Sequence, residues 1–216
     1  MIDIVIPVLN EEEILIEREA YFRTFSKKAR LIFVDGGSSD KTADMAQRFG
    51  RLISSKRGRG LQKNAGAGYA TADTILFLHV DSLISEEALN DIEQIVKNGA
   101  VGGCLTMKID DGRFMFKVYE WIINGRARTR GIIDGDLGLF LKRDIFREIG
   151  GFDNLEMMED IGICYKLRGK GRLKISSHPI CVSSRKWKAQ GFLKTFLQYT
   201  SAYVRFWTGC LKTAKP

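Results

Sequence analysis

Residues 31–46 read LIFVDGGSSDKTADMA, and this stretch contains the pattern that decides the fold. Leu31–Val34 is a short apolar run, which predicts a buried β-strand. A turn of glycine, serine and aspartate follows, and residues 42–49 then predict a helix capped by Ser39 or Asp40. A strand, a polar turn and a helix therefore follow one another directly.

The same unit recurs on both sides of this stretch. Strands are predicted at 4–9, 52–54, 74–79 and 100–109, and helices at 11–26, 60–70 and 86–97. Strands that alternate with helices favour a parallel sheet with helices on both faces. The predicted fold class is therefore α/β, with a mostly parallel, Rossmann-like sheet. Such sheets bind ligands at the carboxyl ends of their strands.

The second half of the chain follows this alternation less closely. It predicts helices at 114–123 and 156–167, a strand at 137–142, a strand pair at 173–176 and 180–183, and a last helix at 192–211. The length of 216 residues suits one domain with an appendage. We therefore expect one domain over residues 1–190 and an amphipathic basic tail over residues 191–216.

Charge is distributed unevenly along the chain. The sequence has 34 Lys and Arg against 26 Asp and Glu, a net charge of +8, and every acidic residue lies at or before Asp160. Residues 161–216 therefore carry only basic charge. Such a segment is either a solvated face or a sign of a nearby polyanion, such as ligand phosphates or an anionic membrane.

The sequence predicts neither a signal peptide nor a membrane span. Met1 leads directly into a strand, and no run of about 18 uncharged apolar residues occurs. The cysteines are scattered without a C-x-x-C pair, which favours reduced thiols over a zinc site or a disulfide framework; they are Cys104, Cys164, Cys181 and Cys210. The expected location is cytoplasmic, with peripheral contact at the inner face of the membrane as a further hypothesis.

Acidic and polar side chains follow the ends of three predicted strands. Asn10 and Glu11 follow the first strand, Asp35 the second, and His79 and Asp81 the third. Burying a carboxylate costs free energy unless it is paired, so packing alone does not favour an acid at a strand end. A single Asp there is often a turn or N-cap residue. Several at one sheet edge indicate a ligand site.

His79 and Asp81 form an H-x-D triplet. In an extended segment, residues two apart point the same way, so both side chains are expected to face one cation. An imidazole and a carboxylate oxygen suit Mn²⁺, or Mg²⁺ bound through Asp81 and water, with substrate phosphates completing the coordination. The alternative for His79 is a partly buried histidine whose hydrogen bonds are satisfied within the protein.

Two further segments place charge at predicted helix N-termini. Arg57-Gly58-Arg59-Gly60 precedes a helix, where a guanidinium and free backbone N–H groups can bind phosphate. Glu159-Asp160 opens another predicted helix, where acids either balance the helix dipole or supply a general base. No G-x-G-x-x-G follows the first strand, which argues against a dinucleotide site.

Taken in order, these motifs resemble those of the family-2 glycosyltransferases of GT-A fold, in a small bacterial and archaeal branch with F-L-H-x-D in place of D-x-D. The matching segments are 6–12 (IPVLNEE), 34–42 (VDGGSSDKT), 77–82 (FLHVDS), Glu159-Asp160 and 183–187 (SSRKW), which together span roughly residues 1–190. The resemblance implies inverting transfer of a sugar from a UDP- or GDP-sugar to a hydroxyl acceptor, with Mn²⁺ or Mg²⁺ as cofactor.

The resemblance also implies roles for individual residues. Asp160 would be the catalytic base with Glu159 oriented beside it, and Asp81 would bind the metal, with His79 in place of the first acid of D-x-D. Contacts with the donor are implied for Pro7, Asn10, Glu11 and Asp35 around the nucleoside, for Arg59 and Asn64 at the ribose and diphosphate, and for Arg185 and Trp187, which would close over the diphosphate. Asp136 would line the acceptor side.

Two other functions compete with this interpretation. A nucleotidyltransferase would carry a glycine-rich and basic loop after the first strand, whereas this chain has Glu11-Glu12-Glu13, which would repel a triphosphate. A non-catalytic nucleotide-sugar module, or a nucleic-acid binder that uses the basic tail, would not gather carboxylates at its site. We therefore expect no nucleic-acid partner.

The last predicted helix has an aromatic stripe. Phe192, Phe196, Tyr199, Tyr203 and Phe206 recur on one helical face, beside basic residues and without an acid. This pattern predicts a helix in the membrane interface, close to a lipid-linked acceptor. The alternative is a helix that packs on its own domain or on the second subunit of a homodimer.

Overall fold

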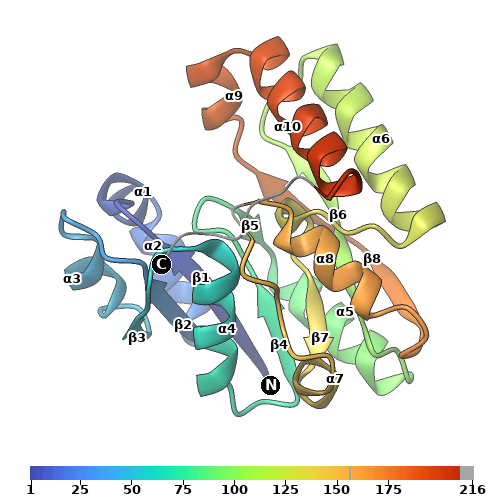
Figure 1. The fold of residues 1–216 in the computed structure, drawn as a ribbon. Coiled ribbons are helices and arrows are strands. Elements are labelled where there is room, and N and C mark those ends of the chain that lie inside the picture. The colour runs from blue at the N-terminus through green and yellow to red at the C-terminus, as the bar shows by residue number, and fades with distance from the viewer. Residues whose placement is uncertain (156, 210–216) are drawn as a thin grey trace.

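The computed structural model describes residues 1–155 and 157–209, in which one eight-stranded sheet is surrounded by helices (Figure 1). The strands are β1 (Ile2–Val8), β2 (Arg30–Asp35), β3 (Arg51–Ser54), β4 (Thr74–Phe77), β5 (Leu83–Ile84), β6 (Gly102–Ile109), β7 (Phe140–Lys142) and β8 (Leu173–Val182). The helices are α1 (Glu12–Glu17), α2 (Glu19–Phe25), α3 (Thr42–Ala46), α4 (Arg59–Tyr69), α5 (Glu86–Lys97), α6 (Phe114–Arg130), α7 (Arg143–Glu148), α8 (Glu159–Lys166), α9 (Arg185–Gln190) and α10 (Phe192–Trp207), with a short 3-10 helix η1 (Gly135–Leu137).

The first half of the chain forms the parallel side of the sheet. β3, β2, β1 and β4 are neighbours in that order, and all three pairings are parallel. Ile4, Val5 and Ile6 of β1 have no exposed surface, because helices cover both faces of this strand. α4 lies so close to the sheet that a Cβ on Gly66 would come within 2.4 Å of Val5. The predicted α/β class with a mostly parallel sheet is confirmed.

The second half of the chain enters the sheet out of sequence order. β7 is antiparallel to both β4 and β6, β8 pairs in parallel with β6, and β5 is antiparallel to β8. β8 is one continuous strand, where the sequence predicted a strand pair. The ladder between β6 and β8 shifts register between Cys104 and Thr106, so the strand continues through Pro179 instead of ending there.

Two long helices, α6 and α10, lie side by side at one end of the sheet (Figure 1). α6 extends to Arg130, well beyond the predicted end at Ile123. The reason is tertiary, because the buried side-chain amide of Asn124 bonds both the N–H (2.8 Å) and the carbonyl (3.0 Å) of Met107 on β6. Gly131, with a φ of 62°, then ends the helix in the left-handed conformation.

Part of the aromatic stripe of α10 packs against its own chain. Phe192 lies 5.5 Å from Phe116 of α6, measured between ring centroids, and Phe206 stacks on Tyr165 of α8 at 6.0 Å. Residues 210–216, the end of the predicted tail, lie outside the described residues. Among the described residues, no helix combines the length and the apolar character needed to cross a membrane.

Candidate active site

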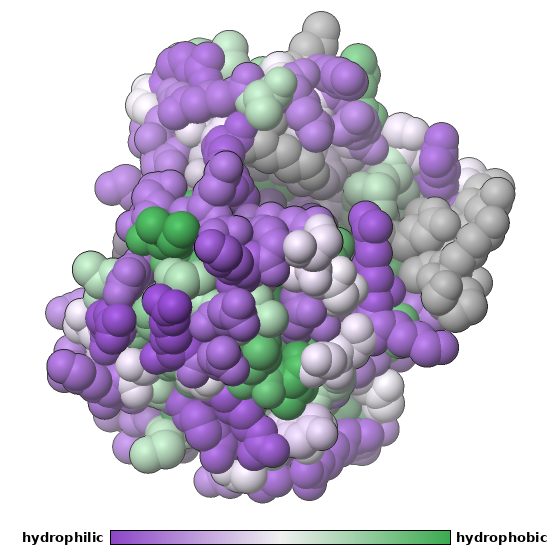
Figure 2. Space-filling model, turned by 90° about the vertical axis from the view of Figure 1, so that its left-hand side faces the viewer, coloured by the Kyte–Doolittle hydropathy of each residue, from purple (hydrophilic) through white to green (hydrophobic). Residues whose placement is uncertain are grey.

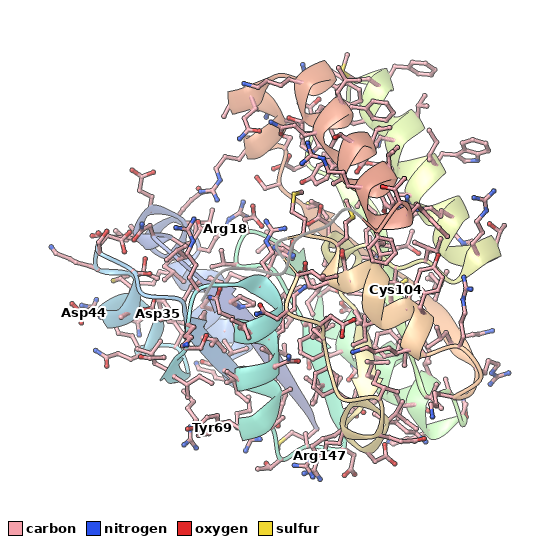
Figure 3. All side chains as sticks on the ribbon, viewed as in Figure 1. Arg18, Asp35, Asp44, Tyr69, Cys104 and Arg147 are labelled. Atoms are coloured by element: carbon pink, nitrogen blue, oxygen red, sulfur yellow. The ribbon has the colours of Figure 1, made fainter. Side chains whose placement is uncertain are left out.

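The turn after β2 is held by Asp35, which is 7% exposed. Its carboxylate accepts the backbone N–H groups of Gly37 (3.0 Å) and Ser38 (3.1 Å) and the Ser38 hydroxyl. Gly37 has a φ of 92°, which favours glycine at this position. In Figure 3, Asp35 lies on the side of the molecule formed by the first half of the chain, and Cys104 lies on the side formed by the second half. Asp35 therefore serves as a turn residue, and its contact with a nucleoside stays a prediction.

The turns after β1 and β2 are tied to each other. Asn10, with a φ of 53°, accepts the N–H of Ser39 at 2.8 Å and donates its own N–H to Ser38 at 2.9 Å. The buried amide of Gln62, a residue to which the sequence assigned no role, donates to the carbonyls of Val8 (3.0 Å) and Val34 (2.8 Å). These bonds hold the two strand ends together at the edge where the sequence predicted the donor site. Pro7 lies within β1, paired with Val34.

Arg185, at the start of α9, joins two predicted site residues that are far apart in sequence. Its guanidinium lies 3.0 Å from the Glu11 carboxylate and 3.8 Å from the Asp81 carboxylate. All three side chains remain partly exposed. The structure thus brings together a residue from the β1 turn, one from the β4 turn and one from the C-terminal part of the chain.

The conformation predicted for the H-x-D triplet is wrong. β4 ends at Phe77, and the N–H of Ser82 bonds the carbonyl of His79 at 3.1 Å, so residues 79–82 form a turn rather than an extended segment. Because these residues are not in a β-strand, the two-residue alternation of side chains does not place His79 and Asp81 on the same side. His79 lies 3.8 Å from the Asp136 carboxylate, whereas Asp81 is directed to Arg185.

The side chains around Asp81 can be tested for their fit to a cation. Burial, together with the charges of Arg59 and Lys63, lowers the pKa of His79 to about 3, so its imidazole is neutral and able to act as a ligand. In the part of the chain that the structure describes, no three His, Cys, Asp or Glu side chains are grouped as a metal cage. Mg²⁺ and similar ions commonly bind one or two carboxylates plus substrate phosphates. The partly exposed carboxylate of Asp81 fits that kind of site.

Beneath the pocket, Lys63 of α4 forms a buried ion pair with Glu159. The Lys63 ammonium lies 2.8 Å from the Glu159 carboxylate, and the two side chains are 4% and 3% exposed. Burial alone would raise the pKa of Glu159, but the charges of Lys63 and Arg59 outweigh that effect and lower it to about 2. Glu159 is therefore held as a fixed negative charge beside Asp160.

Asp160 faces the pocket from the first turn of α8. Burial and the neighbouring charge of Glu159 raise its pKa to about 7, although its carboxylate accepts the N–H of Gly135. The helix starts later than predicted because Met158 has a φ of 66°, an uncommon conformation for a residue with a side chain. This conformation starts the helix at Glu159, and Asp160 then lies within bonding distance of η1.

The pocket at Asp160 lies between η1, α8 and the inner faces of α6 and α10. Its wall comprises Arg59, His79, Tyr119, Asp134, Gly135, Asp136, Met157, Met158, Glu159, Asp160, Tyr199 and Tyr203. A Cβ on Gly135 would lie 3.0 Å from Asp160 Oδ2 and 3.3 Å from His79 Nε2, so these two groups lie on the same side of this glycine. Asp136 lines the same pocket, and its place on the acceptor side stays a prediction.

Sequence reasoning missed four pocket residues that carry a carboxylate or a hydroxyl, and one supporting arginine. Asp134 forms an ion pair with Arg126 and accepts the hydroxyl of Tyr203, whose ring lies 4.4 Å from the Arg126 guanidinium. The signal for Asp134 is the D-x-D pattern at residues 134–136. For Tyr199 and Tyr203 there was only a helical stripe, which does not distinguish a core face from a pocket wall. Tyr119 was assigned only to a predicted helix.

The three remaining predicted donor residues are Arg59, Asn64 and Trp187, and each lies in a different environment. Arg59 begins α4 and lines the pocket, where the charges of Glu159 and Asp136 raise its pKa against the effect of burial. Asn64 instead bonds the backbone of Phe152 through both ends of its amide, at 2.8 and 2.9 Å. Asn64 thereby fixes the loop that leads to α8.

Trp187 is packed inside an aromatic cluster and is 6% exposed. Its ring lies 5.0 Å from Tyr119, 5.1 Å from Phe192 and 5.8 Å from Tyr199, measured between centroids. The predicted contact with the diphosphate would require this cluster to open. Trp187 therefore joins α6, α9 and α10 behind the pocket.

Comparison with known proteins assigns this arrangement to a family. The sequence profile of the family described as "Glycosyl transferase family 2" matches residues 3–150. This match confirms the family and the enzyme class that the motifs predicted. It ends before Glu159, Asp160 and Arg185, so the roles of those residues depend on their geometry. A search of curated proteins finds no significant match to the chain.

Solved structures show the same fold. TarS 1–349 of S. aureus has a TM-score of 0.65 at 19% identity, over 85% of this chain and 60% of that chain, and its complex with UDP-GlcNAc has a TM-score of 0.64 at 18% identity, over 84% and 58%. Glucosyl-3-phosphoglycerate synthase from Mycobacterium tuberculosis, in complex with Mn²⁺, UDP and glucosyl-3-phosphoglycerate, has a TM-score of 0.60 at 16% identity, over 84% and 70%. The chain thus spans about 60% of the length of TarS 1–349.

Proposed function

Because the chain belongs to glycosyl transferase family 2, we propose that it transfers a sugar from a nucleoside-diphosphate sugar to a hydroxyl acceptor, with inversion at the anomeric carbon. The observation that carries this proposal is the position of Asp160. Its carboxylate lies at the pocket floor, against Gly135 and on the same side as His79, where an acceptor hydroxyl can reach it. A pKa of about 7 suits a general base near neutral pH.

The reaction needs one base and one leaving group. In our proposal the acceptor oxygen attacks the anomeric carbon while its proton passes to Asp160, and the bond from that carbon to the diphosphate breaks. A single displacement of this kind inverts the anomeric centre. Glu159 does not take the proton, because Lys63 holds it ionised and buried. Its charge instead keeps Asp160 basic.

The donor is proposed to lie along the ends of β1, β2 and β4, between the turns of Asp35 and Asp81. Arg59 and Arg185 supply positive charge on either side of that edge, which suits a leaving diphosphate. Mn²⁺ or Mg²⁺, held by Asp81 and the diphosphate oxygens, would supply further charge neutralisation there. The fold neighbours bind UDP, UDP-GlcNAc and Mn²⁺, which supports UDP-sugars as the first donors to test.

The acceptor is proposed to enter between α6 and α10. The tyrosines of that wall offer ring faces and hydroxyls, and Asp136 offers a further acceptor of hydrogen bonds. We propose that this hydroxyl belongs to a lipid-linked molecule and that the protein works at the inner face of the membrane. The basic segment after Asp160 supports that placement.

The test uses UDP-, GDP- and dTDP-sugars with Mn²⁺, and compares the wild type with Asp160→Asn. We expect the wild type to hydrolyse or transfer one donor, and the variant to lower turnover by about 10²-fold or more with unchanged donor affinity in calorimetry. The asparagine preserves the shape and the hydrogen bond from Gly135 but cannot take a proton. A variant with wild-type turnover would exclude Asp160 as the base.

A further inference from the structure

Helix α6 exposes a continuous row of large apolar side chains. Phe114 is 83% exposed and Trp121 is 76% exposed, and Met115, Val118 and Ile122 are exposed between and beside them. Their spacing places all five on one side of the helix. The other side is buried against β6 through residues such as Phe116 and Ile123. α6 is therefore apolar on both its inner and its outer side.

Helix α10, which lies beside α6, carries an exposed apolar row of its own. Leu197, Val204 and Trp207 are each more than half exposed, and Phe196 is also exposed. They share one side of the helix, and α6 and α10 run side by side (Figure 1). We call the exposed rows of the two helices, together with their exposed basic residues, the α6–α10 surface.

Apolar exposure of this kind is confined to the α6–α10 surface. Elsewhere in the described chain the only large exposed apolar side chains are Met1, Ile16 and Tyr69, which are scattered. The face over α1 and α3 is mostly hydrophilic (Figure 2). Rows of large apolar side chains this exposed commonly mark a surface that binds a membrane or a partner.

The charge of the α6–α10 surface identifies the partner. Exposed Lys117, Arg128 and Arg130 lie on α6, and exposed Lys194 and Arg205 lie on α10. The sequence of α10 contains no acid. The one acid of α6, Glu120, is mostly buried, accepts the N–H of Ile109 and lies 3.7 Å from the Lys117 ammonium. Trp and Phe beside Lys and Arg are typical of surfaces that bind in the headgroup region of anionic lipids.

We propose that the α6–α10 surface docks the protein on an anionic lipid bilayer, with α6 as the main apolar contact. A second copy of the chain fits less well, because self-association would place these basic side chains against their own copies without carboxylates between them. The stripe predicted from sequence is only part of the contact. Phe192 and Phe206 of that stripe pack inward, and α6 supplies the larger share of exposed apolar side chains.

Docking in this way would place the pocket directly behind the two helices that contact the membrane. The helices that form the surface also line the pocket on their inner sides, through Tyr119 of α6 and through Tyr199 and Tyr203 of α10. A hydroxyl at the bilayer surface could then reach Asp160 between the two helices. This consequence for the acceptor rests on the proposed function, whereas the docking itself does not.

The test is sedimentation of the whole 216-residue chain with vesicles of phosphatidylcholine alone or with about one third phosphatidylglycerol, in the absence of donor. We expect strong binding only to the anionic vesicles and release by high salt. Phe114→Ser with Trp121→Ser should weaken binding by about tenfold or more, because two large apolar contacts are lost. Lys117→Ala with Arg128→Ala should weaken it roughly fivefold for each charge removed.

Two matched variants and one second measurement make the result decisive. Ile16→Ser removes an exposed apolar side chain elsewhere, Lys27→Ala with Lys56→Ala removes two exposed charges elsewhere, and both should bind vesicles like the wild type. Donor binding measured without vesicles should be the same in every variant as in the wild type. A failure to bind donor would therefore count against the proposed function and not against the α6–α10 surface. Equal binding to both kinds of vesicle, or unchanged binding by the Phe114 and Trp121 variant, would overturn the proposal. Loss of a dimer in that variant would assign the surface to a second copy.

Discussion

The two halves of the molecule build their sides of the site by different means. In residues 1–101, several polar groups at the sheet edge bond to their own turn or to the neighbouring strand end, as Asp35 does with Gly37 and Ser38. In the second half, the decisive bonds join separate elements, as in the pairs of Asp160 with Gly135 and of Tyr203 with Asp134. The first half therefore contains a prebuilt edge, where we propose that the donor binds, and we call it the donor half. The pocket of the second half, which we call the acceptor half after its proposed role, exists only when its helices are assembled.

The buried pair of Lys63 and Glu159 joins these two halves, so breaking it should give the largest effect. Lys63→Met leaves Glu159 ionised, buried and unpaired, which should lower the free energy of unfolding by about 3–5 kcal/mol. Urea denaturation measures this loss. The double variant Lys63→Met with Glu159→Leu removes both charges and should recover most of it. A loss below about 1 kcal/mol in the single variant would mean that the pair does not hold the halves together.

Asp81→Ala tests the proposed donor site in the first half of the chain separately from the proposed acceptor site in the second half. We expect metal-dependent donor affinity to fall by about 10²-fold, since even indirect partners of a metal can cost that much. Calorimetry with donor and Mn²⁺ measures the change, and a chelator should abolish the same increment in the wild type. Asp44→Ala is the matched control, because it removes an exposed acid from α3 of the same half (Figure 3). Unchanged affinity in Asp81→Ala would remove the metal assignment.

The acceptor half should govern the pH dependence of transfer. The pKa of Asp160 is raised to about 7, so below that pH the carboxyl is protonated and cannot accept the acceptor proton. We expect kcat/KM to fall about tenfold for each pH unit below 7 and to level off above it. Glu159→Gln removes a negative charge and should move this slope to lower pH. A rate independent of pH between 5 and 8 would exclude Asp160 as the titrating base.

The smallest effect is expected at the turn of the donor half. Asp35→Ala should weaken binding of free UDP and of the full UDP-sugar alike, by about fivefold, the value of one hydrogen bond near 1 kcal/mol. Ser38→Ala is the control, because it removes one bond of the turn and keeps the carboxylate. If only the sugar-dependent part of the affinity is lost, then Asp35 lies elsewhere in the donor site.

Local sequence determined the first half of the fold and its edge. A strand, a polar turn and a helix are formed by residues close in sequence, so apolar runs and glycine turns sufficed to predict the parallel sheet and the positions of Glu11, Asp35 and Asp81 at one edge. The acids Asp136 and Asp160 were also identified, Asp160 from the short E-D pattern at a predicted helix start and Asp136 from the family resemblance. The family follows from the earlier part of the chain, because the family profile matches residues 3–150.

Only the tertiary structure decided the rest. The turn at residues 79–82 ended the strand earlier than its apolar run suggested, and the buried amide of Asn124 extended α6 by bonding β6. Which tyrosines of α10 line a pocket depends on how α6, α8 and α10 pack, and helical periodicity is the same for a core face and for a pocket wall. Likewise, the pKa of Asp160 depends on burial and on Glu159 being held by Lys63, a partner 96 positions away. Interactions of that range carry no local signal, because their free energy is realised only when the chain is folded.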